Sequence, residues 1–204
     1  MEAVAPLATQ GDEHYAFATA ADLVDIVQML QDPAVGRWLW FCPAPAEELT
    51  AFFAPLLDAQ ARALAEGALP NAAVFVVRDN DGEFLGQGAA VSVPASPGGV
   101  EIGFQLPPHA WGRRVGSRLG VFLRAYAVFT AGAERLEGHV LVGNEASRRI
   151  LLGLGLRHEG TRRGYRIKET TRHDEDVFGV LVSELPGDEI ESQARAMGLH
   201  RGRI

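Results

Sequence analysis

The sequence predicts one mixed α/β domain, whose largely antiparallel sheet is covered by helices on both faces. Two amphipathic helical segments come first, and three strand-like segments follow them. Two of these strands flank Asn80-Asp81-Gly82, a strong tight-turn signal, so this part of the sheet is antiparallel. The order then changes to helix, strand, helix and two strands, which excludes a doubly wound nucleotide-binding fold.

The first half of the chain contains two helices and then three strands. Residues 20–31 and 46–66 carry apolar side chains at helical spacing, and Pro33 and Pro70 follow their ends. Beyond Pro70 the period of the apolar residues shortens to that of strands. The strands expected here are residues 73–78, 84–93 and 100–106.

The second half begins with a long amphipathic helix over residues 115–130. A short strand over 136–142 leads to a helix that Asn144 caps and that ends near Gly155. Two late strands are expected over residues 165–168 and 177–183, with a turn between them over residues 172–176. The chain thus divides into a loosely ordered lead-in (residues 1–19), one domain (residues 20–185) and a polar tail with a short helix (residues 186–204).

Length, composition and charge exclude several classes of protein. With 204 residues, 47% of them hydrophobic, the chain can bury a core without disulfides. The single cysteine, Cys42, excludes an internal disulfide and a multi-cysteine metal site, and we expect no metal. A secretory signal and a run of about 20 apolar residues are both missing, which predicts a cytoplasmic protein without a membrane partner. The net charge of −7 argues against a nucleic-acid partner.

The segment from Glu101 to Gly120 runs from a strand through a Gly/Arg turn into a helix. Backbone amides at such a turn, together with the positive end of the helix, can bind phosphate oxygens. Arg113, Arg114 and Arg118 add positive charge. An anion site and an ordinary turn with solvated arginines both remain open on these grounds.

Within this segment, WGRRVGS at residues 111–117 resembles the pyrophosphate loop of the GNAT superfamily, Q/R-x-x-G-x-G/A. It is most similar to the RimJ/RimL-like branch, in which a tryptophan opens the loop. On this resemblance Trp111 takes the opening position, Gly116 the last small position, and Arg114 the place of the central glycine. An arginine there is costly if the backbone needs a positive φ, although its amide remains available.

A second motif, VGNEASRRILLGLGL at residues 142–156, resembles the N-x-x-A/S segment and the later glycine of the same superfamily. The resemblance extends over about residues 23–185. It implies a GNAT-like fold in which a splayed strand pair forms the cofactor cleft. It also implies acetyl-CoA as the acyl donor and a primary amine, on a protein N-terminus or a small molecule, as the acceptor.

The resemblance implies a set of coenzyme A contacts: Gln105, Leu106, Trp111, Gly112, Arg113, Arg114, Val115, Gly116, Ser117 and Asn144. It further implies a bulge near Gln105 or Leu106, where a backbone amide would stabilise the oxyanion. Pro107 and Pro108 have no amide hydrogen and cannot do so.

Glu101 is the first candidate for the general base that deprotonates the amine. Strand alternation places Glu101, Gly103 and Gln105 on one face, which can border the cleft, although Glu101 can equally end a strand in solvent. His109, in the turn, is the second candidate or an exposed loop residue. His139, within a strand, is expected to be structural.

Ser147 is the candidate acid for the leaving thiolate, because Leu151 occupies the place where many members of the superfamily have a tyrosine. A plain hydroxyl on the helix surface is the alternative. The aromatic residues Trp38, Trp40 and Phe41 either line the acceptor pocket or belong to the core.

The sequence therefore predicts an acetyl-CoA-dependent N-acetyltransferase that transfers acetyl directly to a primary amine. Arg114 and Leu151 motivate a second hypothesis, an acyl-CoA-binding module with weak or no turnover. The oligomeric state, including a homodimer, stays open.

Overall fold

The structure is a computed structural model and describes residues 6–202; the outermost residues of the expected lead-in and tail lie outside this range. In the described part, eight strands form one sheet in the order β1-β2-β3-β4-β5-β6-β8-β7. The strands are β1 (Ala8–Gln10), β2 (Glu13–Phe17), β3 (Ala72–Arg78), β4 (Phe84–Ser92), β5 (Gly99–Gln105), β6 (Arg135–Leu141), β7 (Arg157–Lys168) and β8 (Thr171–Leu181).

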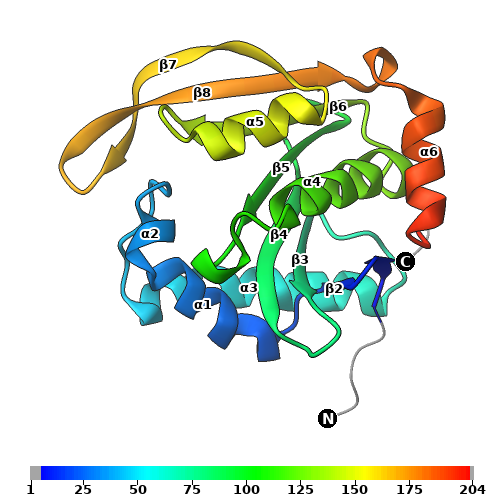
Figure 1. The fold of residues 1–204 in the computed structure, drawn as a ribbon, viewed down its shortest axis with the longest axis horizontal. Coiled ribbons are helices and arrows are strands. Elements are labelled where there is room, and N and C mark those ends of the chain that lie inside the picture. Colours follow the sequence, from blue (N-terminus) through cyan, green and yellow to red (C-terminus); the bar gives the residue numbers. More distant parts are fainter. Residues whose placement is uncertain (1–5, 203–204) are drawn as a thin grey trace.

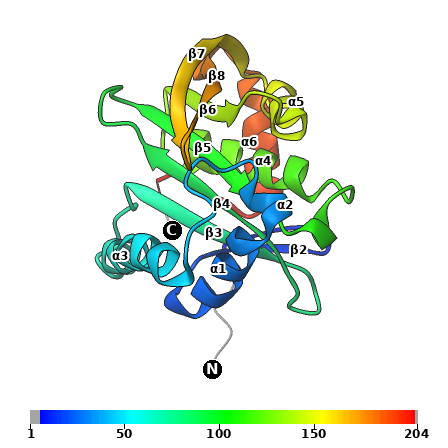
Figure 2. The ribbon, with the colours of Figure 1, turned by 90° about the vertical axis from the view of Figure 1, so that its left-hand side faces the viewer.

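Helices cover both faces of this sheet, as the sequence predicts. The helices are α1 (Leu23–Gln31), α2 (Pro33–Gly36), α3 (Ala46–Ala65), α4 (Val115–Ala125), α5 (Glu145–Gly153) and α6 (Gly187–Ala196). Helices α1 and α3 lie on one face, and α4 and α5 lie on the other (Figure 2). The predicted fold class, a mixed and mostly antiparallel sheet between two helical layers, is confirmed.

Strand β3 shows how the sequence builds two cores. Its side chains alternate between the faces, so Val74 and Val76 pack with α1 and α3, whereas Phe75 and Val77 pack with α4. Because both faces are buried, the strand reads as a continuous apolar run. The hairpin that joins β3 to β4 turns at the predicted Asn80-Asp81-Gly82, where Gly82 has a φ of 82°.

Strands β5 and β6 form the one parallel pair of the described sheet, and α4 connects them. Their pairing runs only from Gly99 opposite Arg135 to Glu101 opposite Glu137. Beyond this point β5 stays paired with β4, and β6 stays paired with β8, so the two strands separate. This is the splayed pair that the family resemblance implies.

The expected loosely ordered lead-in is wrong for the described residues. Residues 8–10 and 13–17 form β1 and β2, a hairpin that turns at Gly11 and extends the sheet beyond β3. Burial explains why this segment is ordered: Tyr15 is fully buried and its ring stacks on Phe122 of α4, with the ring centres 4.5 Å apart.

The late hairpin is longer than expected, and its turn is not at residues 172–176. Strands β7 and β8 meet at residues 169–170, and together they extend beyond the rest of the sheet (Figure 1). Strand β7 carries mostly exposed polar side chains, so little apolar periodicity marks it in the sequence. The helix expected over 115–130 is α-helical to Ala125 and continues as a π-helical turn over Tyr126–Thr130.

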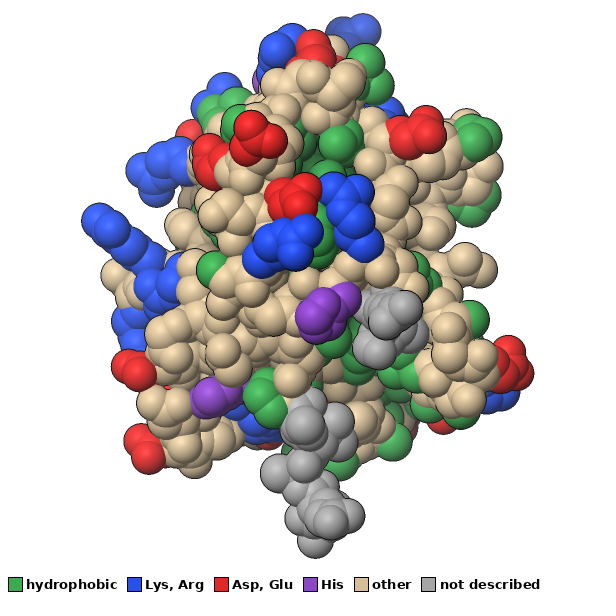
Figure 3. Space-filling model, turned by 90° about the vertical axis from the view of Figure 1, so that its right-hand side faces the viewer, with side chains coloured by type: hydrophobic (Ala, Val, Ile, Leu, Met, Phe, Trp, Pro, Cys, Tyr) green, Lys and Arg blue, Asp and Glu red, His purple; other side chains and the backbone are tan. Residues whose placement is uncertain are grey.

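The short helix expected in the tail is confirmed as α6, which packs against α4; Ala194 and, just beyond the helix, Met197 and Leu199 belong to the same core as α4. On the face of the molecule that carries α6, acidic and basic side chains lie side by side (Figure 3). Glu191, for example, pairs with Arg195 and Arg201. Among the described helices, none combines the length and apolar character needed to cross a bilayer.

Candidate active site

A cavity opens where β5 and β6 separate. It encloses about 740 Å³, counting the open solvent at its mouth. Strands β5, β6, β7 and β8 contribute to its wall, together with α5 and the loop between α2 and α3. A second cavity of about 650 Å³ lies against α5 and Trp111 and shares Phe104, Gln105, Asn144 and Ser147 with the first. The two cavities therefore adjoin each other beside the gap in the sheet.

Glu101 and His139 meet in the first cavity. The parallel register places Glu101 opposite Glu137, and His139 lies two residues further along on the same face. The Nδ1 atom of His139 is 3.8 Å from Oε1 of Glu101, whose side chain is 44% exposed. A side chain at Gly103 would meet no atom within 4 Å, so open space adjoins Glu101.

His139 is a residue that the sequence did not single out for the site. Its side chain is 12% exposed, and its Nε2 atom is buried without a hydrogen-bond partner in the described residues. The expectation that His139 is structural stays a prediction, although its ring lines the first cavity. The register of β5 against β6 brings His139 next to Glu101. This register depends on tertiary structure, so no local sequence pattern shows it.

Glu175 of β8 is a second residue that the sequence did not identify. Its side chain is only 3% exposed, and it is bound by two arginines of β7, at 2.5 Å from Nε of Arg166 and 3.3 Å from Nη1 of Arg162. Of the two arginines, Arg166 lines the first cavity and Arg162 does not.

The aromatic residues between the first helices line the cavity. Trp38, Trp40 and Phe41 all belong to its wall, and the ring of Phe41 meets that of Trp40 edge-on at 5.5 Å. Nζ of Lys168 donates hydrogen bonds to the carbonyl oxygens of Gly36 and Leu39, which ties this loop to the end of β7.

The second cavity is lined mainly by apolar groups from β5 and α5, including Leu106 and Ile150. The indole Nε1 of Trp111 donates a hydrogen bond of 2.8 Å to the carbonyl oxygen of Leu106. This bond holds the start of the 111–117 loop against the end of β5. A Cβ at Gly116 of α4 would come within 3.0 Å of Ile150 of α5 and 3.1 Å of Leu106. The glycine therefore allows α4 and α5 to pack closely.

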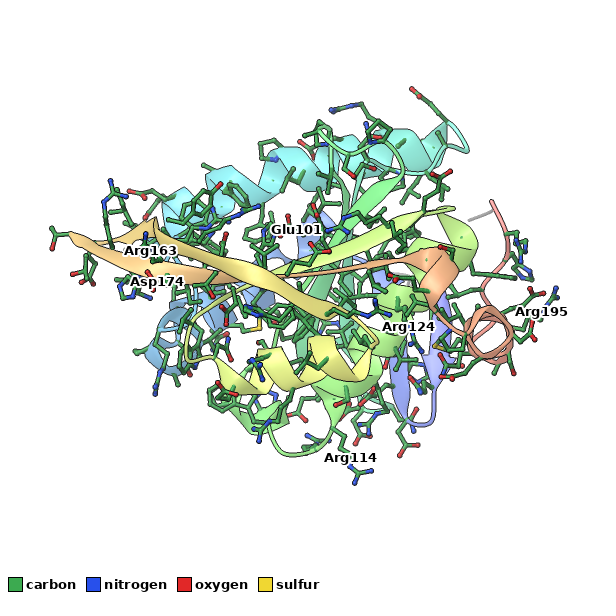
Figure 4. The ribbon with its side chains drawn as sticks, turned by 90° about the horizontal axis from the view of Figure 1, so that it is seen from above. Glu101, Arg114, Arg124, Arg163, Asp174 and Arg195 are labelled. Carbon is green, nitrogen blue, oxygen red and sulfur yellow. The ribbon has the colours of Figure 1, made fainter. Side chains whose placement is uncertain are left out.

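The 111–117 loop has the backbone of an anion-binding turn. Gly112 and Arg114 adopt positive φ angles of 73° and 62°, so the left-handed conformation that arginine disfavours is present. Residues 115–117 open α4, and no protein acceptor within the described residues takes their amide hydrogens. The side chain of Arg114 points away from the body of the protein (Figure 4).

Arg118, expected to add charge to this loop, is directed elsewhere. Its guanidinium binds the buried carboxylate of Glu13, which in turn accepts a hydrogen bond from the Tyr15 hydroxyl. The same guanidinium donates to the carbonyl oxygen of Arg113 at 3.0 Å. Arg118 thus fastens the loop to the N-terminal hairpin.

Helix α5 brings Asn144 and Ser147 to the junction of the two cavities. The side chain of Asn144 accepts a hydrogen bond from the Ser147 amide at 3.2 Å, which confirms the predicted N-cap. Leu151 is buried and packs against Gly138 of β6, so this position holds no hydroxyl group.

Several other predicted features lie outside the site. His109 bonds the carbonyl oxygen of Phe84 at 3.0 Å and lies outside both cavities. Pairing of β4 with β5 runs in register from Ser92–Val100 to Gln87–Gln105 within the described residues, so the bulge expected near Gln105 or Leu106 does not lie within this paired part of β5. Cys42 is buried, and burial raises the pKa of its thiol. The described residues contain no cluster of three metal-ligating side chains.

Comparison with known proteins places this geometry among acetyltransferases. A family model for the acetyltransferase (GNAT) domain matches residues 16–157. Over 82 residues the chain is 31% identical to the uncharacterized N-acetyltransferase YoaA of Bacillus subtilis (strain 168). This match covers 40% of the chain and 46% of the relative, so the chain spans about half the length of that relative.

Solved structures share the fold at lower identity. A spermidine N-acetyltransferase from Vibrio cholerae, in complex with CoA and spermine, superposes with a TM-score of 0.70 at 15% identity and covers 85% of this chain and 98% of its own. RimJ of Mycobacterium smegmatis, in complex with CoA-disulfide, gives a TM-score of 0.72 at 18% identity, covering 90% of this chain and 88% of its own. At these identities the likeness concerns the fold alone.

Proposed function

Because the chain belongs to the GNAT acetyltransferase family, we propose that it transfers the acetyl group of acetyl-CoA directly to a primary amine. The acceptor is a protein N-terminus or a small amine. The observation that carries this proposal is the pair of adjoining cavities beside the separated strands β5 and β6. Two adjoining cavities allow two substrates to bind side by side and react where the cavities meet.

The second cavity and the 111–117 loop suit the donor. The amide hydrogens of residues 115–117 and the positive end of α4 can hold the pyrophosphate. The apolar groove between Leu106 and Ile150 suits a pantetheine arm, whose thioester end would then lie near Asn144 and Ser147. In this proposal the predicted contact residues bind coenzyme A mostly through their backbone groups and through packing, rather than through charge. They include Gln105, Trp111 and Gly112. The assignment to the RimJ/RimL-like branch remains a prediction.

The first cavity suits the acceptor, with Glu101 as the general base. The carboxylate is partly exposed, borders open space and has His139 beside it, so a proton taken from the ammonium can pass toward solvent. The need for this base depends on the amine. A lysine amine with a pKa of ~10.4 costs about 3 kcal/mol more to deprotonate than an α-amino group with a pKa of ~8.

The bond changes follow from these positions. The neutral amine attacks the thioester carbonyl carbon, the new C–N bond forms, the nitrogen gives up its extra proton to solvent, and the C–S bond breaks. The amide hydrogen of Leu106, just beyond the paired part of β5, is the proposed donor to the carbonyl oxygen as its negative charge develops. The hydroxyl of Ser147, at the junction of the cavities, is the proposed proton donor to the leaving thiolate, and it takes a proton from solvent in exchange. A thiol has a pKa of ~8.5, so a weak donor suffices.

Two assays on the full chain test the proposal. Thermal unfolding with and without acetyl-CoA reports donor binding, since a ligand bound only by the folded state raises the Tm. Release of free thiol over a panel of amines reports turnover. We expect a higher Tm with acetyl-CoA and amine-dependent thiol release. Binding of acetyl-CoA without turnover on any amine would contradict the catalytic part, and no binding would contradict the whole proposal.

A further inference from the structure

An irregularity in β7 brings two arginines to one carboxylate. In the pairing of β7 with β8, Arg162 lies opposite Glu175 and Arg166 opposite His173, so four residues of β7 span only two residues of β8. Gly164, within the extra stretch, adopts a φ of 58° that permits the bend. Both arginines therefore lie on the face of Glu175 and bind it. In a regular ladder Arg166 would lie opposite residue 171 and could not do so.

The guanidinium of Arg166 is held in a fixed orientation at the wall of the first cavity. Its Nε donates to Glu175, and its Cζ atom lies 4.8 Å from the centre of the Trp40 ring and 5.0 Å from that of the Tyr165 ring. Within the described residues, no protein acceptor binds its two terminal amino groups. The side chain of Arg166 is 24% exposed, so its two terminal amino groups are available to donate hydrogen bonds to a ligand.

The charges around the cavity do not cancel locally. Glu175 also lines the cavity and binds both arginines, so these three side chains together carry one excess positive charge, and Arg166 is the arginine that reaches the cavity. On the β5 side, Glu101 adds a negative charge that no arginine or lysine pairs within the described residues. The cavity therefore presents an anion to one part of the acceptor and a cation to another. A linear polyamine would bring a second ammonium toward the guanidinium of Arg166, which disfavours it.

From this arrangement we propose that the acceptor carries a carboxylate close to its amine and that the terminal amino groups of Arg166 bind this carboxylate. The inference rests on the acetyl transfer proposed above and defines its substrate class. Two sources share this chemistry: a free α-amino acid, and a peptide N-terminus with an acidic side chain at its second residue. In either case Glu101 faces the amine, and Arg166 sets the position of the acceptor.

Matched acceptor pairs test this selectivity in the wild-type protein. One pair is an α-amino acid and its carboxamide; the other is a peptide with Asp at its second residue and the same peptide with Asn. A carboxamide lowers the pKa of the neighbouring amine, so the first pair is compared per concentration of neutral amine. We expect kcat/KM to be about tenfold or more higher for the carboxylate member of one pair, in line with a charge-assisted hydrogen-bond pair. The pair that shows this difference in kcat/KM identifies the acceptor as a free amino acid or a peptide N-terminus.

Two variants separate ligand binding from the ion pair with Glu175. Arg166→Gln removes the cation that lines the cavity, and Arg162→Gln removes the other partner of Glu175, which does not line it. We expect Arg166→Gln to raise KM for the carboxylate acceptor about tenfold and to abolish the preference within the pair. Arg162→Gln should keep that preference. If Arg166→Gln fails to fold, as judged by its Tm, the kcat/KM ratios of the wild-type protein within each acceptor pair still test the proposal.

The failures of the two proposals look different. If no amine at all is acetylated, the acetyl transfer itself is contradicted. If the wild type acetylates neutral amines or spermidine as well as the carboxylate acceptors, only the inference about Arg166 is overturned. Retention of the preference by a folded Arg166→Gln variant would overturn it equally.

Discussion

The imidazole of His139 lies 3.8 Å from the carboxylate of Glu101, across the gap where the parallel strands β5 and β6 separate. Both residues lie on the face of the sheet that borders the first cavity. One is an acid with partial access to solvent, and the other has a ring nitrogen without a partner in the described residues. A proton taken from an amine in this cavity has a short path from one group to the other.

Replacing Glu101 should therefore lower turnover more than it lowers binding. We expect Glu101→Gln to reduce kcat about a hundredfold or more, because a positioned general base contributes roughly this factor. The Kd for acetyl-CoA, measured by calorimetry, should stay unchanged. Glu137→Gln is the matched control, since Glu137 lies opposite Glu101, pairs with Arg135 and does not line the cavity. Equal loss of kcat in both variants would contradict the role of Glu101.

Ser147 should assist departure of the thiolate. Steady-state kinetics of Ser147→Ala should show kcat reduced about tenfold, less than the usual effect of a general acid, because a thiolate is already a tolerable leaving group. The exposed hydroxyl of Ser183, outside both cavities, provides a control in Ser183→Ala. An unchanged kcat for Ser147→Ala would leave this side chain with no chemical role.

Arg114 carries a conformational cost that glycine would remove. Its φ of 62° lies in the left-handed region, so Arg114→Gly should raise the free energy of unfolding by about 0.5–1 kcal/mol, after allowing for the flexibility that glycine adds to the unfolded chain. Denaturant unfolding measures this change. Glu169→Gly, at a φ of 54° in the distant β7–β8 turn, should give a similar gain.

The same variants separate the backbone of the loop from its charge. If the amides hold the pyrophosphate, neither glycine variant should change the Kd for acetyl-CoA by more than about twofold, well below the effect of a lost charge-assisted hydrogen bond. A tenfold weaker Kd for Arg114→Gly alone would show that its side chain binds the donor instead.

Asp176 should make stability depend on pH in the acid range. Burial acts to raise the pKa of its carboxyl, but hydrogen bonds from Thr161, at 2.5 Å, and His158, at 3.0 Å, outweigh burial and leave the pKa below its ordinary value of 3.8. A lowered pKa in the folded state stabilises the fold above the unfolded pKa of ~3.9, and this contribution is lost as the pH falls through the folded pKa.

Thermal unfolding across this pH range measures the effect. Asp176→Asn should lower the Tm near pH 7, and the difference from the wild type should shrink below about pH 5 and close once the wild-type carboxyl is protonated. Asp58→Asn, on the exposed face of α3, should show no such pattern. A difference in Tm that stays constant down to the acid end would contradict the assignment to Asp176.

The sequence predicted those parts of the fold that local patterns determine. The hairpin at Asn80-Asp81-Gly82, the cap at Asn144 and the helix α3 all follow from turn chemistry and apolar spacing. The β1–β2 hairpin was missed although Gly11-Asp12 marks its turn, because its strands are short and only partly buried. The β7–β8 turn was misplaced because β7 is an exposed edge strand with few apolar residues.

The candidate site was harder to predict, since its residues come together through tertiary pairing. Glu101, Ser147 and the 111–117 loop were found because motifs or strand alternation mark them. His139 joins Glu101 only through the register of a parallel pair formed across α4, and no local pattern encodes that register. Arg166 reaches Glu175 only through the irregular pairing of β7 with β8.

The most direct test follows an isotopically labelled acetyl group from acetyl-CoA in a single turnover with a carboxylate-bearing amine. The account predicts that all transferred label appears on the amine nitrogen of the acceptor, that none stays on the protein, and that Glu101→Gln transfers it about a hundredfold more slowly. Label retained on the protein, at the buried Cys42 or elsewhere, would contradict direct transfer, and an undiminished rate in Glu101→Gln would contradict the proposed base.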